Sequence, residues 1–202
     1  QQITHKLFNN RVGQTLATAA LLASILSAAQ TSAQNQINNP DQAALAKEAM
    51  QHIKAFGGEL KTAVKAGVMQ GGPQNAILVC NQQAPAIADK HSADKWSVGR
   101  TSMKLRNPDN APTEWEAQVL RDFEAKLTAG ADPKTLTARK IEDGQFHFMK
   151  AITVGSLCLN CHGDKLEEPV ALRLSELYPN DQATGYQLGQ LRGAFTLTRP
   201  LD

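Results

Sequence analysis

Two cysteines and a histidine stand together in the last quarter of this 202-residue chain, in the order Cys158-Leu159-Asn160-Cys161-His162. This C-x-x-C-H spacing is typical of the covalent attachment of a c-type haem. Two thiols one helical turn apart can each form a thioether to a vinyl group, and the adjacent imidazole then lies beneath the iron. The motif therefore predicts haem c as the cofactor, with His162 as the proximal iron ligand.

Three other interpretations of the pentapeptide are weaker. A structural zinc site would need a fourth ligand, usually from a second closely spaced pair, and the sequence has no such pair. A thioredoxin-like dithiol needs no histidine after it and would follow an early strand, whereas this pair lies late in the chain. A disulfide between Cys158 and Cys161 would close a strained short loop. We therefore expect covalent haem attachment.

Cys80 is the cysteine that the motif leaves over. It falls on one side of an expected helix together with Ile77, Ala84 and Ile87, so its side chain is expected to point inward. A thiolate is a strong donor that favours ferric iron, which makes Cys80 a candidate for the second axial position. A small buried hydrophobe is the competing interpretation, and the spacing leaves both open.

Five further side chains could ligate haem iron: Met103, Met149, His147, His91 and His52. Met103 falls on the inward face of an expected strand, although methionine in such a place more often belongs to the core. His147 faces away from two neighbouring phenylalanines and His91 stands among charged residues, so we expect both to contact solvent. His52 lies beside the apolar stripe of a helix.

The N-terminal segment has the pattern of a secretory signal. Lys6 and Arg11 precede a weakly apolar stretch over 16–29, and Thr31-Ser32-Ala33 follows as a small-residue cleavage pattern. We predict a signal peptide over 1–33, a polar linker over 34–41 and a periplasmic location. An uncleaved membrane anchor is the rival interpretation, and only then would the protein associate with a membrane.

Loss of the signal removes two of the 21 basic residues and none of the 19 acidic ones, so the remaining chain is formally neutral. Nucleic-acid binding proteins usually carry an excess of basic residues, because they neutralise phosphates. We therefore expect no nucleic-acid partner.

Hydrophobic spacing predicts helices in the first part of the chain. Apolar residues recur every three or four positions from 41 to about 67, and Gly71-Gly72-Pro73 separates this stretch from a second helix. Thr113 and Glu116 form a capping box for a third helix, which ends near residue 130.

Strand signals dominate the second half. Alternation over 96–106 predicts a strand, and Asp143-Gly144 between extended runs over 136–142 and 145–154 predicts a β-hairpin. A short helix over 168–177 and a closing strand at 195–197 follow. The fold class is α+β, with helices mostly first and then an antiparallel sheet.

Three arginines are candidates for binding the haem propionates. Arg100 and Arg106 flank the strand expected to cover the cofactor, and Arg192 lies near the closing strand. A guanidinium group suits a propionate because it can bind a carboxylate through two hydrogen bonds. A solvated strand face is the competing interpretation for each of them.

Several motifs together resemble the c-type haem family with a PAS-like sensory fold. They are Ala76-Ile77-Leu78-Val79-Cys80 with Ala84-Pro85, Val98-Gly99-Arg100-Thr101-Ser102 with Leu105-Arg106-Asn107-Pro108, Cys158 to Gly163, and Tyr178 through Gly185-Tyr186 to Arg192-Gly193-Ala194. The resemblance implies a PAS-like haem domain over 42–202, with N-terminal helices and the haem packed against an antiparallel sheet. It also implies His162 as the proximal ligand and Cys80 as the distal one.

These observations lead to two functional hypotheses. In the first, the chain is a periplasmic monohaem protein in redox or small-gas sensing, and release of Cys80 lets NO or CO bind. In the second, it is a small electron-transfer cytochrome that exchanges electrons with a redox partner protein. Catalysis by a peroxidase would need a distal base or a polarising arginine, and no distal His-Arg pair can be placed from the sequence. We therefore expect that the chain is not an enzyme.

Overall fold

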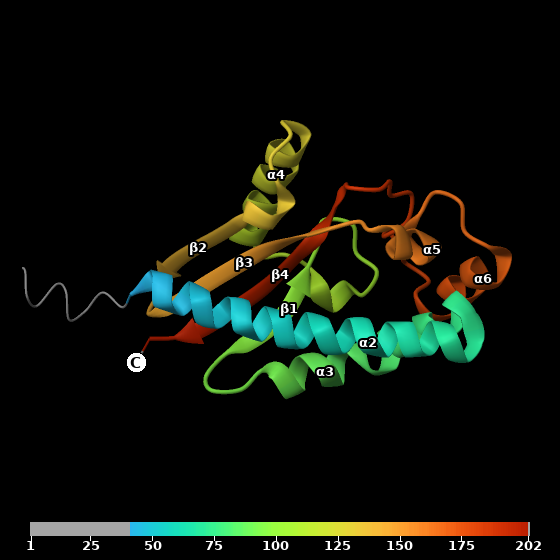
Figure 1. Ribbon diagram of the computed structural model, residues 1–202, viewed down its shortest axis with the longest axis horizontal. Coiled ribbons are helices and arrows are strands. Elements are labelled where there is room, and N and C mark those ends of the chain that lie inside the picture. The colour runs from blue at the N-terminus through green and yellow to red at the C-terminus, as the bar shows by residue number, and fades with distance from the viewer. Residues whose placement is uncertain (1–40, 202) are drawn as a thin grey trace, which may run out of the picture. The chain divides into compact units, whose positions relative to one another are not determined.

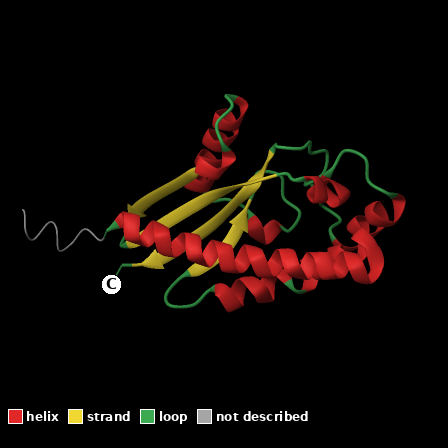
Figure 2. Cartoon of the chain, in the orientation of Figure 1, coloured by secondary structure: helices red, strands yellow, loops and turns green. Residues whose placement is uncertain are grey.

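A four-stranded antiparallel sheet forms the centre of the computed structural model, which describes residues 41–201 (Figures 1 and 2). The strands are β1 (Ser97–Thr101), β2 (Thr137–Glu142), β3 (Gln145–Thr153) and β4 (Leu191–Pro200), in the spatial order β1-β4-β3-β2. The helices are α2 (Gln42–Gln82), α3 (Ala84–His91), α4 (Glu114–Thr128), α5 (Leu159–His162) and α6 (Glu168–Leu177). The α+β prediction is confirmed. The predicted signal peptide and residues 34–40 of the linker lie outside the described residues.

The hairpin of β2 and β3 follows directly from its turn. Asp143 and Gly144 both have positive φ angles, 49° and 71°, as a two-residue turn between twisted strands requires. The two strands pair from Thr137 with Lys150 to Glu142 with Gln145. The predicted hairpin is therefore confirmed.

Strand β1 is shorter than predicted. The chain leaves the sheet after Thr101, because the Ser102 hydroxyl donates to the Arg192 carbonyl (2.7 Å) where the strand pairing of β1 and β4 ends. The alternation predicted up to residue 106 therefore breaks at residue 102. Met103, predicted to face inward, is 49% exposed, so that prediction is wrong.

Helix α2 contains a sharp break at the predicted place. Gly71 and Gly72 have non-helical backbone angles, with φ of 76° at Gly72, and a new helical segment starts at Pro73. The first segment runs along the sheet in Figure 1 and buries one face against it. That face consists of Leu45, Ala49, Ile53, Phe56 and Leu60.

The two faces of the sheet carry different cores. Phe146 and Phe148 of β3 pack with α2 and α3, whereas Met149 of the same strand packs with Phe123 of α4 on the other face. Helix α4 begins with the predicted capping box, in which Thr113 and Glu116 bond reciprocally. The sheet is therefore covered on both faces: α2 and α3 cover the face that carries Phe146 and Phe148, and α4 covers the other.

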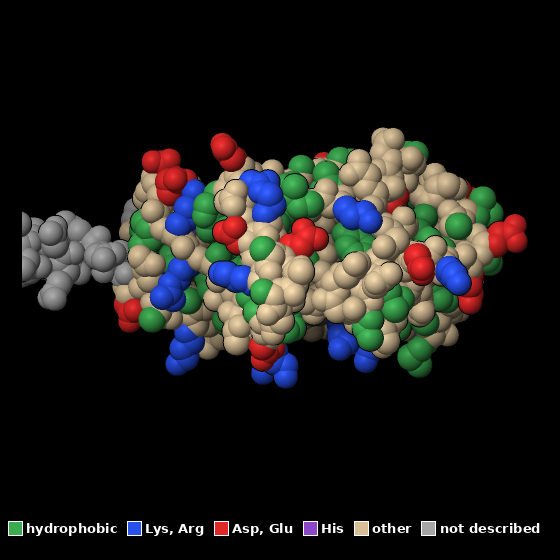
Figure 3. Space-filling view, turned by 90° about the horizontal axis from the view of Figure 1, so that it is seen from above, with side chains coloured by type: hydrophobic (Ala, Val, Ile, Leu, Met, Phe, Trp, Pro, Cys, Tyr) green, Lys and Arg blue, Asp and Glu red, His purple; other side chains and the backbone are tan. Residues whose placement is uncertain are grey.

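No helix in the described part of the chain is long and apolar enough to cross a membrane. The face seen in Figure 3 carries basic and acidic side chains interspersed. The absence of a nucleic-acid partner stays a prediction.

Candidate cofactor-binding site

A cavity of about 360 Å³ lies on the sheet face that α2 and α3 cover. Most of the residues predicted for the site line it: Cys80, Cys158, His162, Arg100, Arg106 and Arg192. These side chains come from parts of the chain more than 100 residues apart. The volume is in the range of small-molecule and cofactor sites.

Local structure explains why the C-x-x-C-H motif reaches this cavity. The register of β3 with β4 shifts between Ile152 and Thr153, and the chain then leaves the sheet. A 3₁₀ turn (Ser156–Cys158) leads into the single helical turn α5. The motif is thus helical, as the thioether spacing requires, and it begins close to the end of a rigid strand.

The imidazole of His162 is held in one orientation. Its Nδ1 donates to the carbonyl oxygen of Ala183 (2.7 Å), which can only accept, so Nε2 keeps its lone pair. Burial, with the nearby cations Arg106 and Arg192, lowers the pKa of His162 to about 3. His162 is therefore neutral at ordinary pH, which is the form that binds a metal.

The backbone of His162 is also fixed by the segment around Ala183. The His162 carbonyl accepts from the N–H of Tyr186 (2.9 Å), and the Gly163 carbonyl accepts from the N–H of Gly185 (2.9 Å). The Tyr186 ring lies edge-on to the imidazole, with ring centroids 6.3 Å apart. The loop over residues 183–186 therefore binds one side of the motif through backbone hydrogen bonds and a ring contact.

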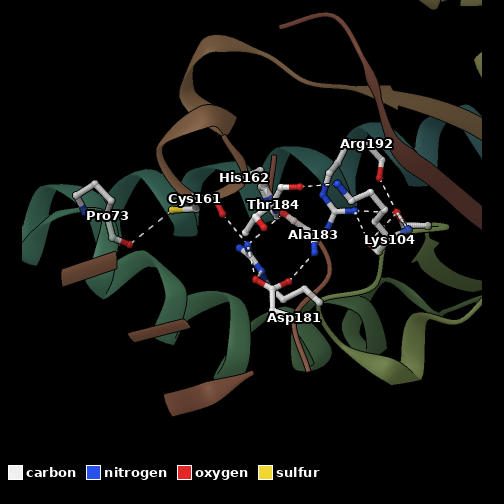
Figure 4. Close-up of polar contacts among 10 residues, drawn as sticks. Pro73, Lys104, Cys161, His162, Asp181, Ala183, Thr184 and Arg192 are labelled. Atoms are coloured by element: carbon white, nitrogen blue, oxygen red, sulfur yellow. Dashed lines mark hydrogen bonds and ion pairs between the residues drawn. The ribbon is translucent and has the colours of Figure 1, made fainter. Parts of the chain in front are cut away.

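Arg106 does not present a free guanidinium to the cavity. It pairs with Asp181 (3.0 Å), and both side chains are nearly buried, at 9% and 8% exposure. Arg106 also donates to the carbonyls of Cys161 (2.6 Å) and Ala183 (3.3 Å), in the network drawn in Figure 4. Its contact with a haem propionate stays a prediction, and in this structure its hydrogen bonds go to Asp181 and to backbone carbonyls.

Arg100 and Arg192 differ from Arg106 in having no carboxylate partner among the residues described. The Arg100 guanidinium lies 5.9 Å from the centroid of the Phe56 ring, and Arg192 donates to the Ser102 hydroxyl (2.9 Å). Burial lowers the pKa of both groups. The cavity therefore carries two positive charges that no acid of the described chain neutralises by ion pairing.

Cys80 lines the cavity from the second segment of α2, and its side chain is partly buried, as predicted. Burial raises the pKa of the Cys80 thiol, and the positive charges of Arg100, Arg106 and Arg192 oppose that rise. The thiol is thus protonated in the absence of a metal, and the three arginines offset only part of the cost of forming a buried thiolate.

The two cysteines of the motif have different surroundings. Cys158 lines the cavity, and its sulfur accepts from the N–H of Gly155 (3.3 Å). The Cys161 sulfur lies 3.9 Å from the Pro73 carbonyl, and Cys161 packs beside a small core cluster of Ile77, Val170 and Leu174. All three cysteines are free, so the structure contains no disulfide between Cys158 and Cys161.

None of the five other candidate ligands lines the cavity. Met103 is exposed, and Met149 is fully buried on the opposite face of the sheet. His91 is paired with Glu59 (2.8 Å) outside the cavity. His147 lies two residues before Met149 on β3, and the His52 ring lies tilted by 40° against the Trp96 ring, with centroids 5.4 Å apart.

Protein side chains alone do not assemble a metal site here. Within residues 41–201, no group of three or more His, Cys, Asp or Glu side chains converges on one point. One histidine and one cysteine on a common cavity are, in contrast, a suitable axial pair for an iron whose other ligands come from a porphyrin. The donor set therefore fits a haem.

Sequence reasoning missed Asp181 and the Ala183 carbonyl. Asp181 stands in the loop after α6, 75 residues from Arg106, and no local pattern links the two. A weak signal exists, because Asp181 also accepts from the N–H of Ala183 (2.8 Å), a side-chain turn that aspartate commonly forms.

Comparison with known proteins supports the fold described above. A model of the Tll0287-like family matches residues 12–200 of the chain. A solved structure, that of the cyanobacterial heme-protein Tll0287, is similar with a TM-score of 0.57 and 24% sequence identity, covering 81% of this chain and 98% of that chain. No curated protein matches the sequence.

Proposed function

The chain belongs to the Tll0287-like family, and we propose that it is a periplasmic monohaem c-type protein in redox or small-gas sensing. The iron would be held between His162 and Cys80. The observation that carries the proposal is the shared cavity: Cys158 and His162 of the C-x-x-C-H motif line it together with Cys80. The related cyanobacterial protein, described as a heme-protein, adds support.

His162 and Cys80 would bind the iron in different ways. A bound haem supplies an iron that cycles between the ferric and ferrous states and binds diatomic gases at a free axial position. His162 is ready to ligate, because its Nε2 lone pair is free. Cys80 must first lose a proton, since burial raises the pKa of its thiol. Because a thiolate favours ferric iron, reduction would weaken the bond to Cys80 rather than the bond to His162.

The proposed attachment uses both cysteines of the motif. Cys158 already lines the cavity, whereas Cys161 must turn its sulfur away from the Pro73 carbonyl. The contact with Pro73 is long and weak, at 3.9 Å, so this rotation costs little.

Arg100 and Arg192 are the better partners for the propionates. Both line the cavity and lack an ion-pair partner in the described chain. Two carboxylates would therefore neutralise two buried cations. Arg106, the third arginine predicted to bind a propionate, has its charge already neutralised by Asp181.

The test of attachment is the mass of the protein matured in a bacterium that assembles c-type cytochromes. We expect one haem per chain that stays bound after denaturation, and its loss in the double variant Cys158→Ser/Cys161→Ser. Cys80→Ser is the matched control, because it removes the third cysteine and should keep the haem. A wild-type mass equal to that of the polypeptide alone would overturn the proposal.

Gas binding separates sensing from plain electron transfer. In a sensor, release of Cys80 on reduction opens a coordination position, so CO or NO should shift the Soret band of the reduced protein. In an electron carrier both ligands stay on the iron. A Soret band that neither gas moves, from mildly acidic to mildly alkaline pH, would argue for the carrier.

A further inference from the structure

The buried ion pair Arg106–Asp181 is joined to the proximal histidine through a single residue, Ala183. One carboxylate oxygen of Asp181 accepts from the Arg106 guanidinium (3.0 Å) and the other from the N–H of Ala183 (2.8 Å). The carbonyl of Ala183 then accepts from both Arg106 (3.3 Å) and His162 Nδ1 (2.7 Å). The ion pair therefore forms hydrogen bonds with both the N–H and the carbonyl of Ala183.

Arg106 and His162 share one acceptor. The positive charge of Arg106 draws electron density from the Ala183 carbonyl and weakens it as an acceptor for His162. The hydrogen bond at Nδ1 sets the basicity of Nε2. A weaker hydrogen-bond acceptor at Nδ1 therefore makes Nε2 a poorer electron-pair donor to a metal. The charge of the pair thus reaches the proposed iron ligand through a defined hydrogen bond.

Arg106 also fixes the backbone of the motif itself. It donates at 2.6 Å to the carbonyl of Cys161, the residue that precedes His162 in the chain. Arg106 therefore contacts two groups that adjoin His162: the carbonyl of Cys161, which precedes it in the chain, and the carbonyl of Ala183, which accepts from its ring. Arg192 lies nearby, but its hydrogen bonds go to Ser102 and the Lys104 carbonyl instead.

We propose that Arg106 and Asp181 are positioning residues that set the reduction potential of the haem through the Ala183–His162 hydrogen bond. This inference rests on the proposed function. Arg106 raises the potential, because it weakens the acceptor for His162 and adds positive charge that disfavours ferric iron. Asp181 lowers the potential, because it neutralises Arg106.

The two single variants should shift the potential of the haem-loaded protein in opposite directions. Arg106→Gln should decrease the equilibrium constant for one-electron reduction by about tenfold, which corresponds to about 59 mV. Asp181→Asn should increase it by a similar factor, since the amide oxygen can still accept from Ala183 and leaves Arg106 uncompensated. In the double variant the two shifts should cancel, and this variant also serves if one single variant fails to fold.

The Fe–His stretching frequency in the reduced protein, measured in a Cys80→Ala background, reports on the ring directly. It should rise in Arg106→Gln, because the Ala183 carbonyl becomes a stronger acceptor. A merely structural role would loosen Ala183 in both single variants, move both potentials the same way and shift the double variant at least as far. Either that result or unchanged potentials would overturn the inference. A wild-type protein without haem would instead refute the proposed function.

Discussion

Replacing Arg106 with Gln should destabilise the fold by about 3–5 kcal/mol, the cost typical of removing one partner of a buried ion pair. The two side chains are 9% and 8% exposed, so solvent screens the pair weakly. The same substitution weakens the hydrogen bonds to the carbonyls of Cys161 and Ala183. Because domains of this kind are stable by about 5–15 kcal/mol, we expect a folded but clearly weakened protein.

Urea unfolding followed by circular dichroism measures this effect. Arg173→Gln is the matched control, because Arg173 pairs with Glu176 at 2.9 Å but the two side chains are 39% and 49% exposed. It should cost no more than about 1 kcal/mol. The double variant Arg106→Gln/Asp181→Asn should cost less than the sum of its single variants by about 2–3 kcal/mol, since it leaves no unpaired charge. A cost for Arg106→Gln as small as that of Arg173→Gln, with additive singles, would refute this explanation.

Three further substitutions test other parts of the structure. Gly193→Ala should cost about 1–3 kcal/mol, because its Cβ would lie 2.3 Å from the Thr101 carbonyl; an unchanged melting temperature would contradict this. Gly58→Ala should stabilise helix α2 by about 0.5–1 kcal/mol in the same assay, since nothing lies within 4 Å of its Cβ, and a destabilised variant would count against it. A hydrogen bond from Lys90, more than any other contact, lowers the pKa of Glu59 below its ordinary 4.5. The ionised Glu59 carboxylate therefore contributes to stability above pH 4.5, and this contribution is lost as the pH falls through the lowered pKa. The melting temperature of Glu59→Gln should lie below that of the wild type near neutral pH and converge with it in acid, and a constant gap would speak against the interpretation.

Local signals in the sequence predicted most secondary structure. The Asp143-Gly144 turn, the Thr113 capping box and the break at Gly71-Gly72 each depend on a few adjacent residues, and the structure contains all three. The inward direction of Cys80 also followed from helical spacing. These features were predictable because their physical cause lies within a turn or two of the chain.

The errors arose where distant segments meet. The end of β1 depends on Ser102 bonding to Arg192, 90 residues away, and alternation alone carried the predicted strand past it to Met103. Asp181, the ion-pair partner of Arg106, could likewise not be identified from spacing, because the two residues lie 75 positions apart. Such contacts are set by the tertiary fold, so they need the structure.

The most direct test of the proposed iron ligands is the EPR spectrum of the ferric protein beside that of Cys80→Ala. With His162 and Cys80 both bound, the wild type should give a low-spin signal. The variant should lose that signal in favour of a high-spin one, because none of the other candidate ligands lines the cavity. Identical low-spin spectra from the two proteins would show that Cys80 is not a ligand and would contradict the proposed site.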